Sequence, residues 1–356
     1  MKIDSLHYDF REIDGYDKTF NFIVSEREAG KTTAGILKKC VSAWKSGFTS
    51  LILKRNVVDV TDIFINDMGA VIEKFKDDPS INIEEVNLKY KLSSIKDGIV
   101  DVYLNEKLFV RIIALSIKIS RFKSLLLKNV KYLLFDEFIC NMRLGEKYLK
   151  GEAFKFKELY KTFNRENKDR RIKCYFLGNP YSLFNPYFVE FGIDTNKLKR
   201  GEVYAKNDCL VQLYELKPEL KEFILKNDPL YNFDDLYSKY AFSGENINDK
   251  NIQILENVPN NFAREYIFRI DNKLIGIYRG QIASNSNLFY CKFENNYNKE
   301  TFAFCFEFSQ LQDRTILLDN AMKMKFHYYK RAFQNREVYF QNIECYYLCE
   351  EIYLNL

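Results

Sequence analysis

Apolar and polar positions follow two different periods along this chain, and the changes of period mark the expected helices and strands. Consecutive apolar residues between turn residues predict buried strands, whereas apolar residues three or four positions apart predict helices. In the first half of the chain the two patterns alternate, which is typical of an α/β domain. The strands expected there cover 20–24, 49–54, 86–92, 99–104, 108–114, 130–135 and 172–177, and the helices cover 34–44, 60–75 and 147–166.

The pattern changes near residue 200, where short strands and helices replace the regular alternation. Two strands are expected within 202–216, followed by helices at 218–227 and 234–240, strands at 266–270, 274–278, 288–293 and 302–308, and helices at 320–333 and 343–354. We therefore expect three parts. They are an α/β domain over 1–200, a linker or lid subdomain over 201–255 and a smaller α+β domain over 256–356.

The first strand leads into a polar turn, and Gly30-Lys31-Thr32 then opens a helix. This is the context of a phosphate-binding loop, because a helix N-terminus presents free amides and a partial positive charge to an anion. Lys31 can reach the β- and γ-phosphates, and the Thr32 hydroxyl can bind Mg²⁺. A chance Gly-Lys-Thr at a helix start is the alternative, and Ser25 replaces the first glycine of the usual pattern. The residues expected to bind nucleotide are Ser25, Arg27, Ala29, Gly30, Lys31, Thr32 and Thr33.

A second apolar strand ends in Asp136-Glu137. Carboxylates at the C-terminal edge of an α/β sheet lie where such sheets bind ligands. Asp136 fits the acid that holds Mg²⁺, and Glu137 fits the general base that activates water. Two surface acids ending a strand are the alternative. The strand at 172–177 ends in Asn179-Pro180, which suits either a sensor of the γ-phosphate or an ordinary turn.

Composition limits the partners and the chemistry. The 356 residues carry 54 Lys and Arg against 49 Asp and Glu, which permits nucleic acid as a partner. The basic stretch at 116–128, which contains Lys123, is either a solvated loop or a contact to DNA or to a neighbouring nucleotide. The start of the chain is not a signal peptide, no run approaches a membrane span, and the eight scattered cysteines favour reduced thiols over a zinc site.

Taken together, these motifs resemble the double-stranded DNA packaging ATPases of phi-twenty-nine-like tailed phages. The resemblance covers most of residues 14–190. It is carried by the degenerate phosphate loop with Arg27 inside it, Phe-Asp-Glu-Phe at 135–138, Asn-Arg-Glu at 164–166, Leu-Gly-Asn-Pro-Tyr-Ser at 177–182 and Asn-Pro-Tyr-Phe at 185–188.

The resemblance implies an ATP- and Mg²⁺-dependent ring motor, pentameric in the family, that pumps double-stranded DNA into an empty capsid. Such a motor works in the host cytoplasm, docked on the portal vertex, and uses a packaging RNA as a scaffold. The implied fold is an ASCE-type P-loop NTPase domain with a mostly parallel sheet, a linker, and an RNase H-like C-terminal domain without nuclease activity. Membrane association is not expected.

The same resemblance implies roles for single residues. Lys31 and Thr32 match the Walker A positions, Asp136 and Glu137 match Walker B and its catalytic glutamate, and Asn179 matches the coupling position. Lys123 falls where the family has a basic residue that reaches the neighbouring subunit's nucleotide. Arg165 matches the arginine finger best, with Arg170 and Arg171 as further candidates. Plausible DNA contacts are Lys54, Arg55, Arg121 and Lys123.

Two other classes of function remain open at this stage. One is a nucleotide-switched module that binds nucleic acid or capsid without processive work, and the other is a helicase-like host ATPase. Glu137 favours hydrolysis over switching alone, and the lack of helicase motifs after Asn179 disfavours the helicase. A nuclease needs clustered carboxylates for two metals, whereas residues 262–310 offer only Glu265, Asp271, Glu294, Glu300 and Glu307.

Overall fold

The computed structural model divides the chain into two compact units, residues 1–248 and 249–356. Each unit has its own sheet. The structure describes residues 8–122, 127–141, 144–165, 167, 171–183, 185–229, 252–270, 273–281, 287–295, 301–335 and 337–356.

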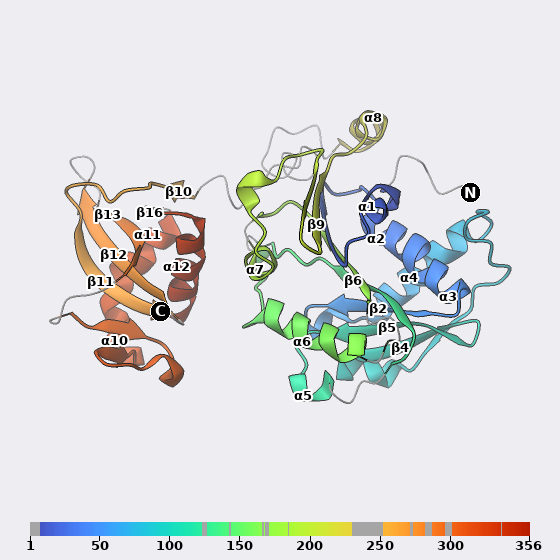
Figure 1. Ribbon diagram of the computed structural model, residues 1–356, viewed down its shortest axis with the longest axis horizontal. Coiled ribbons are helices and arrows are strands. Elements are labelled where there is room, and N and C mark those ends of the chain that lie inside the picture. Colours follow the sequence, from blue (N-terminus) through green and yellow to red (C-terminus); the bar gives the residue numbers. More distant parts are fainter. Residues whose placement is uncertain are drawn as a thin grey trace. The chain divides into compact units, whose positions relative to one another are not determined.

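A nine-stranded sheet forms the centre of the first unit (Figure 1). Its six middle strands are parallel, and the strands at both edges are antiparallel. In spatial order the strands are β3 (Leu88–Tyr90), β4 (Ile99–Leu104), β5 (Lys107–Ala114), β2 (Thr49–Lys54), β6 (Val130–Asp136), β7 (Lys173–Gly178), β1 (Phe20–Ser25), β9 (Cys209–Tyr214) and β8 (Val203–Lys206).

The position of β7 defines the class of this sheet. β7 pairs in parallel with both β1 and β6, so one strand separates the phosphate-loop strand from the strand that ends in Asp136. This insertion is the arrangement of the ASCE group of P-loop NTPases, as the sequence predicted. Because all three strands are parallel, their C-terminal ends meet at one edge of the sheet and deliver the phosphate loop, the two acids and Asn179 there.

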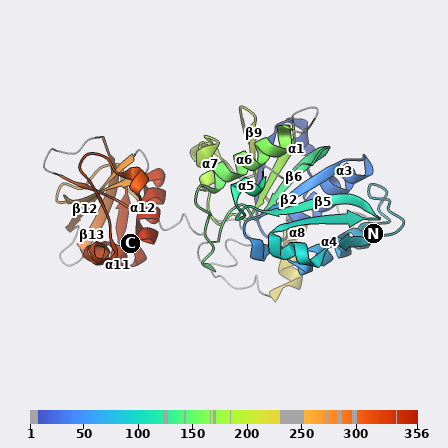
Figure 2. The same cartoon turned by 90° about the horizontal axis from the view of Figure 1, so that it is seen from below.

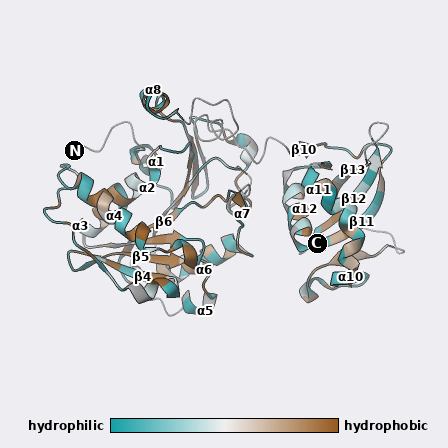
Figure 3. Cartoon of the chain, turned by 180° about the vertical axis from the view of Figure 1, so that it is seen from behind, coloured by the Kyte–Doolittle hydropathy of each residue, from teal (hydrophilic) through white to brown (hydrophobic). Residues whose placement is uncertain are grey.

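Consecutive residues of the central strands pack on opposite faces of the sheet. The Phe176 ring contacts Phe156 of α6 (Glu152–Arg165), with ring centroids 4.8 Å apart. Leu177 instead approaches Gly35 in the helix after the phosphate loop, where a Cβ atom would lie 2.4 Å from Leu134. Covering both faces explains why these strands read as continuous apolar runs. Figure 3 shows the resulting hydrophobic colouring on the strands around β5.

The helix after the phosphate loop is continuous from Lys31 to Lys45. It comprises α2 (Lys31–Ala34), a π-helical segment (Gly35–Val41) and α3 (Ser42–Lys45). The further helices of the first unit are α1 (Arg11–Gly15), α4 (Asp62–Phe75), α5 (Ile119–Phe122), α7 (Pro186–Glu190) and α8 (Pro218–Asn227). α4 and α6 confirm the helices expected at 60–75 and 147–166, with later starts.

The boundary expected at residue 200 differs from the division into compact units. β9 pairs with β1 along six residues, and β8 pairs with β9, so both strands extend the first sheet. The sequence pattern showed the two strands but not their partner, because β1 lies about 190 positions earlier in the chain. The helix expected at 234–240 lies outside the described residues.

The second unit is built on a seven-stranded sheet with two long helices against it (Figures 1 and 2). β11 (Ala263–Ile270), β12 (Lys273–Gln281) and β13 (Asn287–Glu294) form an antiparallel meander, and β14 (Ala303–Cys305) and β15 (Thr315–Leu317) add in parallel beside β11. If β11 to β15 are numbered 1 to 5, they lie in the spatial order 3-2-1-4-5. This is the strand order of RNase H-like folds, as expected. β10 (Gln253–Ile254) and β16 (Val338–Phe340) complete the sheet beyond β13.

α10 (Asn320–Lys323), α11 (His327–Asn335) and α12 (Ile343–Asn355) follow the meander in the chain. Side chains of α11 and α12, including Tyr329 and Cys345, share one core with β12, β13 and β16. All eight cysteines are buried, and none of them is part of a disulfide in the structure. In the described parts of the chain, no helix has the length and apolar character that a bilayer crossing requires.

Candidate nucleotide-binding site

The phosphate loop folds as its sequence requires. β1 ends at Ser25, and Gly30 adopts a left-handed conformation with φ 68° before the helix begins at Lys31. A residue with a Cβ atom adopts this conformation only at a cost, so glycine suits the position. The Lys31 ammonium donates to Ser25 Oγ (2.8 Å) and to the carbonyl oxygens of Ser25 (3.2 Å) and Glu26 (3.1 Å). Burial lowers the pKa of this ammonium to about 8, although Asp136 and Glu26 oppose the shift.

A cleft of about 400 Å³ opens above this loop, and the acids and the amide expected at the site line it. Of the residues expected to bind nucleotide, Ser25 alone does not line the cleft. Its side chain is buried beneath the loop, where its hydroxyl holds Lys31. The lining residues are Arg27, Glu28, Ala29, Gly30, Lys31, Thr32, Thr33, Asp136, Glu137, Leu177, Gly178, Asn179 and Asp228.

Thr32 and Asp136 come together as a metal-binding pair would. The Thr32 hydroxyl donates to Asp136 Oδ1 at 2.8 Å, and the Lys54 ammonium lies 3.0 Å from Asp136 Oδ2. A hydroxyl and a carboxylate are hard oxygen ligands of the kind that Mg²⁺ takes in phosphate sites. The residues present therefore fit the metal, and Lys54 already places a positive charge beside the same carboxylate.

Glu137 stands on the rim of the cleft with an unusual backbone. Its φ is 59°, in the left-handed region, where a non-glycine residue is held only by its surroundings. The next residue, Phe138, donates its N–H to the Leu177 carbonyl at 3.2 Å. Partial removal from water, followed by the negative charge of Asp136, raises the pKa of the Glu137 carboxyl. A raised pKa brings a carboxylate closer to the basicity that a general base needs.

Asn179 joins the phosphate loop to the end of β7. Its Oδ1 accepts from Lys31 Nζ at 3.2 Å, and its amide nitrogen lies 3.4 Å from the Tyr181 hydroxyl. The same hydroxyl accepts from Arg27 Nη2 at 3.1 Å. One short polar chain thus connects Arg27, Asn179 and Lys31 across the cleft.

Two of the candidate finger residues, Arg165 and Arg171, lie at the other edge of the sheet. α6 begins beside the site and ends where β6 and β7 begin, since Asn164 Oδ1 accepts from Ile172 N at 3.0 Å. Arg165 is exposed at this end, and 14 residues of helix span about 20 Å. Arg165 therefore lies far from the phosphate loop of its own chain.

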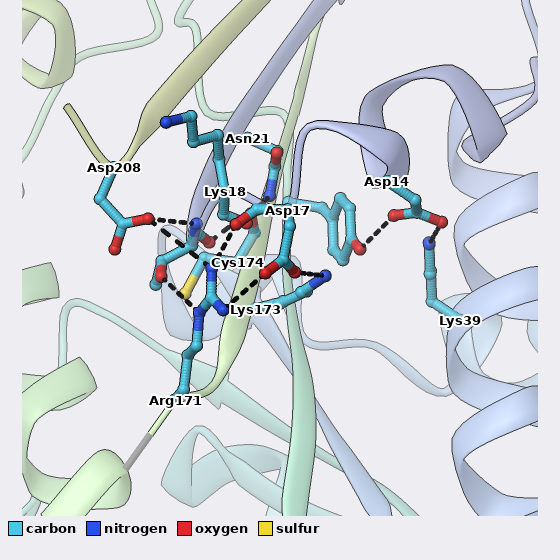
Figure 4. Close-up of polar contacts among 11 residues, drawn as sticks. Asp14, Asp17, Lys18, Asn21, Lys39, Arg171, Lys173, Cys174 and Asp208 are labelled. Carbon is cyan, nitrogen blue, oxygen red and sulfur yellow. Dashed lines mark hydrogen bonds and ion pairs between the residues drawn. The ribbon is translucent and has the colours of Figure 1, made fainter. Parts of the chain in front are cut away.

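Arg171 is engaged within the chain at the same far edge (Figure 4). Its guanidinium donates to Asp17 Oδ2 at 2.8 Å and lies 3.9 Å from Asp208 Oδ1. These ion pairs argue against Arg171 as a finger. Arg170 and Lys123, the other basic residues singled out for contacts with a neighbouring subunit, lie outside the described residues.

Two residues expected to contact DNA are instead buried in ion pairs beside the site. Lys54 and Arg55 are each only 7% exposed, and both form ion pairs inside the protein. Lys54 bonds to Asp136, and Arg55 to Glu152. Sequence reasoning missed this because a basic pair at a strand end also suits an exposed loop. The missing information was the pairing of β2 with β6, which sets Leu53 opposite Phe135 and which only the tertiary structure provides. Arg121 is exposed, as the DNA prediction requires.

Asp228 is a further residue of the cleft that the sequence did not indicate. It follows α8 directly and lines the cleft. Glu26 of the loop is fully buried and pairs with Arg200, which also binds Glu215 at 3.0 Å just after β9. The phosphate loop is thus linked by charge to the segment that leads into α8.

The fold and the site together define a P-loop NTPase of the ASCE class. A family model of podovirus DNA encapsidation proteins (Gp16) matches residues 2–355. The chain belongs to this family.

Individual relatives agree with this assignment. The chain is 28% identical over 209 residues to the DNA packaging protein of Bacillus phage phi29, a match that covers 59% of this chain and 56% of that protein. The chain thus spans just over half the length of the phi29 relative. It is 25% identical over 341 residues to the DNA packaging protein of Bacillus phage B103, which covers 92% of this chain and 94% of that protein.

Two solved structures share the fold over nearly the whole chain. The bacteriophage Phi-29 viral genome packaging motor assembly matches with a TM-score of 0.63 at 21% identity, covering 99% of both chains. The Phi-28 gp11 DNA packaging motor matches with a TM-score of 0.64 at 19% identity, covering 95% of both chains.

Proposed function

We propose that this chain is the ATP-hydrolysing subunit of a ring motor that moves viral double-stranded DNA into a preformed procapsid. The observation that carries the proposal is the meeting of Lys31, Thr32, Asp136 and Glu137 at one cleft, in a chain that belongs to the DNA encapsidation family. The chemistry of these four groups is that of ATP hydrolysis.

Each of these groups has a distinct role in the proposed reaction. The helix N-terminus at Lys31 holds the phosphates, and the Lys31 ammonium neutralises charge that develops on the γ-phosphoryl group. Thr32 and Asp136 would hold Mg²⁺, which supplies further neutralisation of the phosphate oxygens. Glu137 accepts the proton of the attacking water, and its raised pKa suits that step.

Asn179 supplies the link from hydrolysis to movement in this proposal. Its bond to Lys31 and its contact with Tyr181 support this role, because they join the phosphate loop to the loop that follows β7. Loss of the γ-phosphoryl group changes what Lys31 contacts, and the hydrogen bonds of Asn179 change with it. A shift of the 179–188 segment would pass that change to the rest of the chain.

Neighbouring subunits complete the site in this proposal. Because Arg165 lies at the sheet edge away from its own cleft, a finger role requires the cleft of another copy, as in a closed ring. Lys123 is proposed to act on the same neighbouring nucleotide. The ring would be a pentamer docked on the procapsid portal in the host cytoplasm, with a packaging RNA as a further partner, as expected for the family.

Nuclease activity is proposed to be absent. Glu294 accepts from the Tyr278 hydroxyl and lies 3.6 Å from Arg264 and 3.7 Å from Lys292, and Glu265 lies 3.5 Å from Arg279. These cations form ion pairs with the carboxylates that a metal would need. No cluster of three potential metal ligands occurs among the described residues.

The test of the proposed function is Lys31→Ala, with Lys38→Ala as a matched control. Lys38 lies on the same helix but faces Asp9, 3.6 Å away. We expect Lys31→Ala to abolish ATP hydrolysis and DNA packaging into procapsids, and Lys38→Ala to retain both. If Lys31→Ala motors fill procapsids at the normal pace, the proposal is wrong. If ATP still binds and switches DNA affinity without hydrolysis in the unmodified protein, the chain is a nucleotide-switched module instead.

A further inference from the structure

A buried ion pair contacts the residue that follows Glu137 in the chain. The Arg55 guanidinium donates from Nε to both oxygens of Glu152, at 3.1 and 3.0 Å, and from Nη2 to the Phe138 carbonyl at 2.8 Å. Arg55 is 7% exposed and Glu152 1% exposed. A charge pair this deep is costly unless its hydrogen bonds are complete, and replacing it by apolar residues is often neutral for stability. Stability alone therefore does not explain its presence.

The hydrogen bonds of Glu152 are shared among several parts of the unit. Its Oε1 also accepts from the Tyr187 hydroxyl at 2.8 Å, and its Oε2 from the Leu149 N–H at 2.8 Å. Arg55 additionally lies over the rings of Phe135 and Tyr148. The pair thus ties the end of β2, the loop after β6, the start of α6 and α7 together at one point.

The bond to the Phe138 carbonyl acts on the second peptide unit after Glu137. A left-handed φ at a non-glycine residue is energetically costly, so the backbone at Glu137 needs external support. The Phe138 N–H bond to Leu177 holds the first peptide unit after Glu137, and the Arg55 bond holds the second. Without Arg55, the loop can relax toward an ordinary conformation that swings the Glu137 carboxylate away from the phosphate loop.

We infer that Arg55 and Glu152 are positioning residues that hold the Glu137 carboxylate in its catalytic place through the Phe138 carbonyl. This inference rests on the proposed ATP hydrolysis and deepens it. The Arg55–Glu152 pair also holds the start of α6 in place relative to the catalytic loop of its own subunit. The other end of α6 carries Arg165.

The test measures single-turnover ATP hydrolysis and ATP affinity in the full-length chain assembled with DNA and procapsids. Arg55→Lys keeps the charge but loses the forked geometry, and Arg55→Met with Glu152→Met replaces the pair by apolar side chains. We expect the hydrolysis rate to fall by about ten- to a hundredfold in both, with ATP affinity within about twofold of the unmodified protein, because a misplaced group slows the step without weakening substrate binding.

The matched control is Arg111→Lys. Arg111 forms an equally close two-bond pair with Asp101 between β4 and β5, away from the cleft. The hydrolysis rate of the Arg111→Lys variant should equal that of the unmodified protein. If Arg55→Lys and the double variant hydrolyse ATP at the normal rate, or if ATP affinity and melting temperature fall in step with the rate, the inference is wrong. If the unmodified protein and Arg111→Lys both fail to hydrolyse ATP, the proposed function fails instead.

Discussion

At the scale of single residues, burial sets the chemistry of this site. Lys31 is 8% exposed, and the low dielectric around it lowers its pKa to about 8. Glu137 follows β6, which β7 separates from β1. Removal from water and the charge of Asp136 raise the pKa of its carboxyl. Desolvation thus disfavours the charged form of both groups, and it moves the Glu137 carboxylate toward the basicity that a general base needs.

Glu137→Gln tests the proposed base. The amide cannot accept the proton of the attacking water, so we expect hydrolysis to fall by about 10²–10⁴-fold, while ATP binding is retained. In the unmodified protein the rate should fall as pH is lowered through the pKa of Glu137. Because that pKa is raised, the loss occurs at a higher pH than for an ordinary glutamate. Normal turnover of Glu137→Gln in a steady-state assay would exclude this residue as the base.

At the scale of elements, α6 connects two edges of one sheet. Its first residue, Glu152, bonds to Arg55 near the cleft, and its last residue, Arg165, is exposed where β6 and β7 begin. A helix is a stiff rod, so a displacement at one end moves the other. This geometry suits an element that is linked to the cleft of its own subunit through Arg55 and that would reach the cleft of a partner copy through Arg165.

Mixing variants tests whether Arg165 acts in trans. Arg165→Ala subunits keep their own base, and Glu137→Ala subunits keep their own arginine. We expect each variant alone to lose about 10³-fold or more in hydrolysis rate, and the mixture to recover part of the activity. Sedimentation of the mixture would show that subunits still assemble. An inactive mixture that assembles normally would assign the finger to another residue.

At the scale of the whole molecule, the two units differ in the chemistry that their sheet edges carry. The first unit gathers acids, a lysine and an amide around an open cleft. The second unit has an RNase H-like strand order, but Glu265 and Glu294 face arginine and lysine side chains. In this sheet, Glu265 and Glu294 are therefore paired with cations.

Incubation with DNA and Mn²⁺ tests the proposed lack of nuclease activity. The purified chain should leave supercoiled plasmid intact, because no described carboxylate cluster holds two metals. Arg264→Ala, which removes one cation beside Glu294, serves as a check that freeing one acid does not restore cleavage. Nicking by the unmodified chain that disappears in Asp271→Ala would contradict the proposal.

Sequence by itself determined the phosphate loop, the Asp136-Glu137 strand end and Asn179, because these signals are local: a strand, its turn and the next helix lie within a few residues. Only the tertiary structure decided which distant strands are neighbours. It placed β9 beside β1, and it buried Lys54 against Asp136 of β6 and Arg55 against Glu152 of α6. Burial and pairing between segments far apart in the chain depend on packing, which a one-dimensional pattern of apolar residues does not encode.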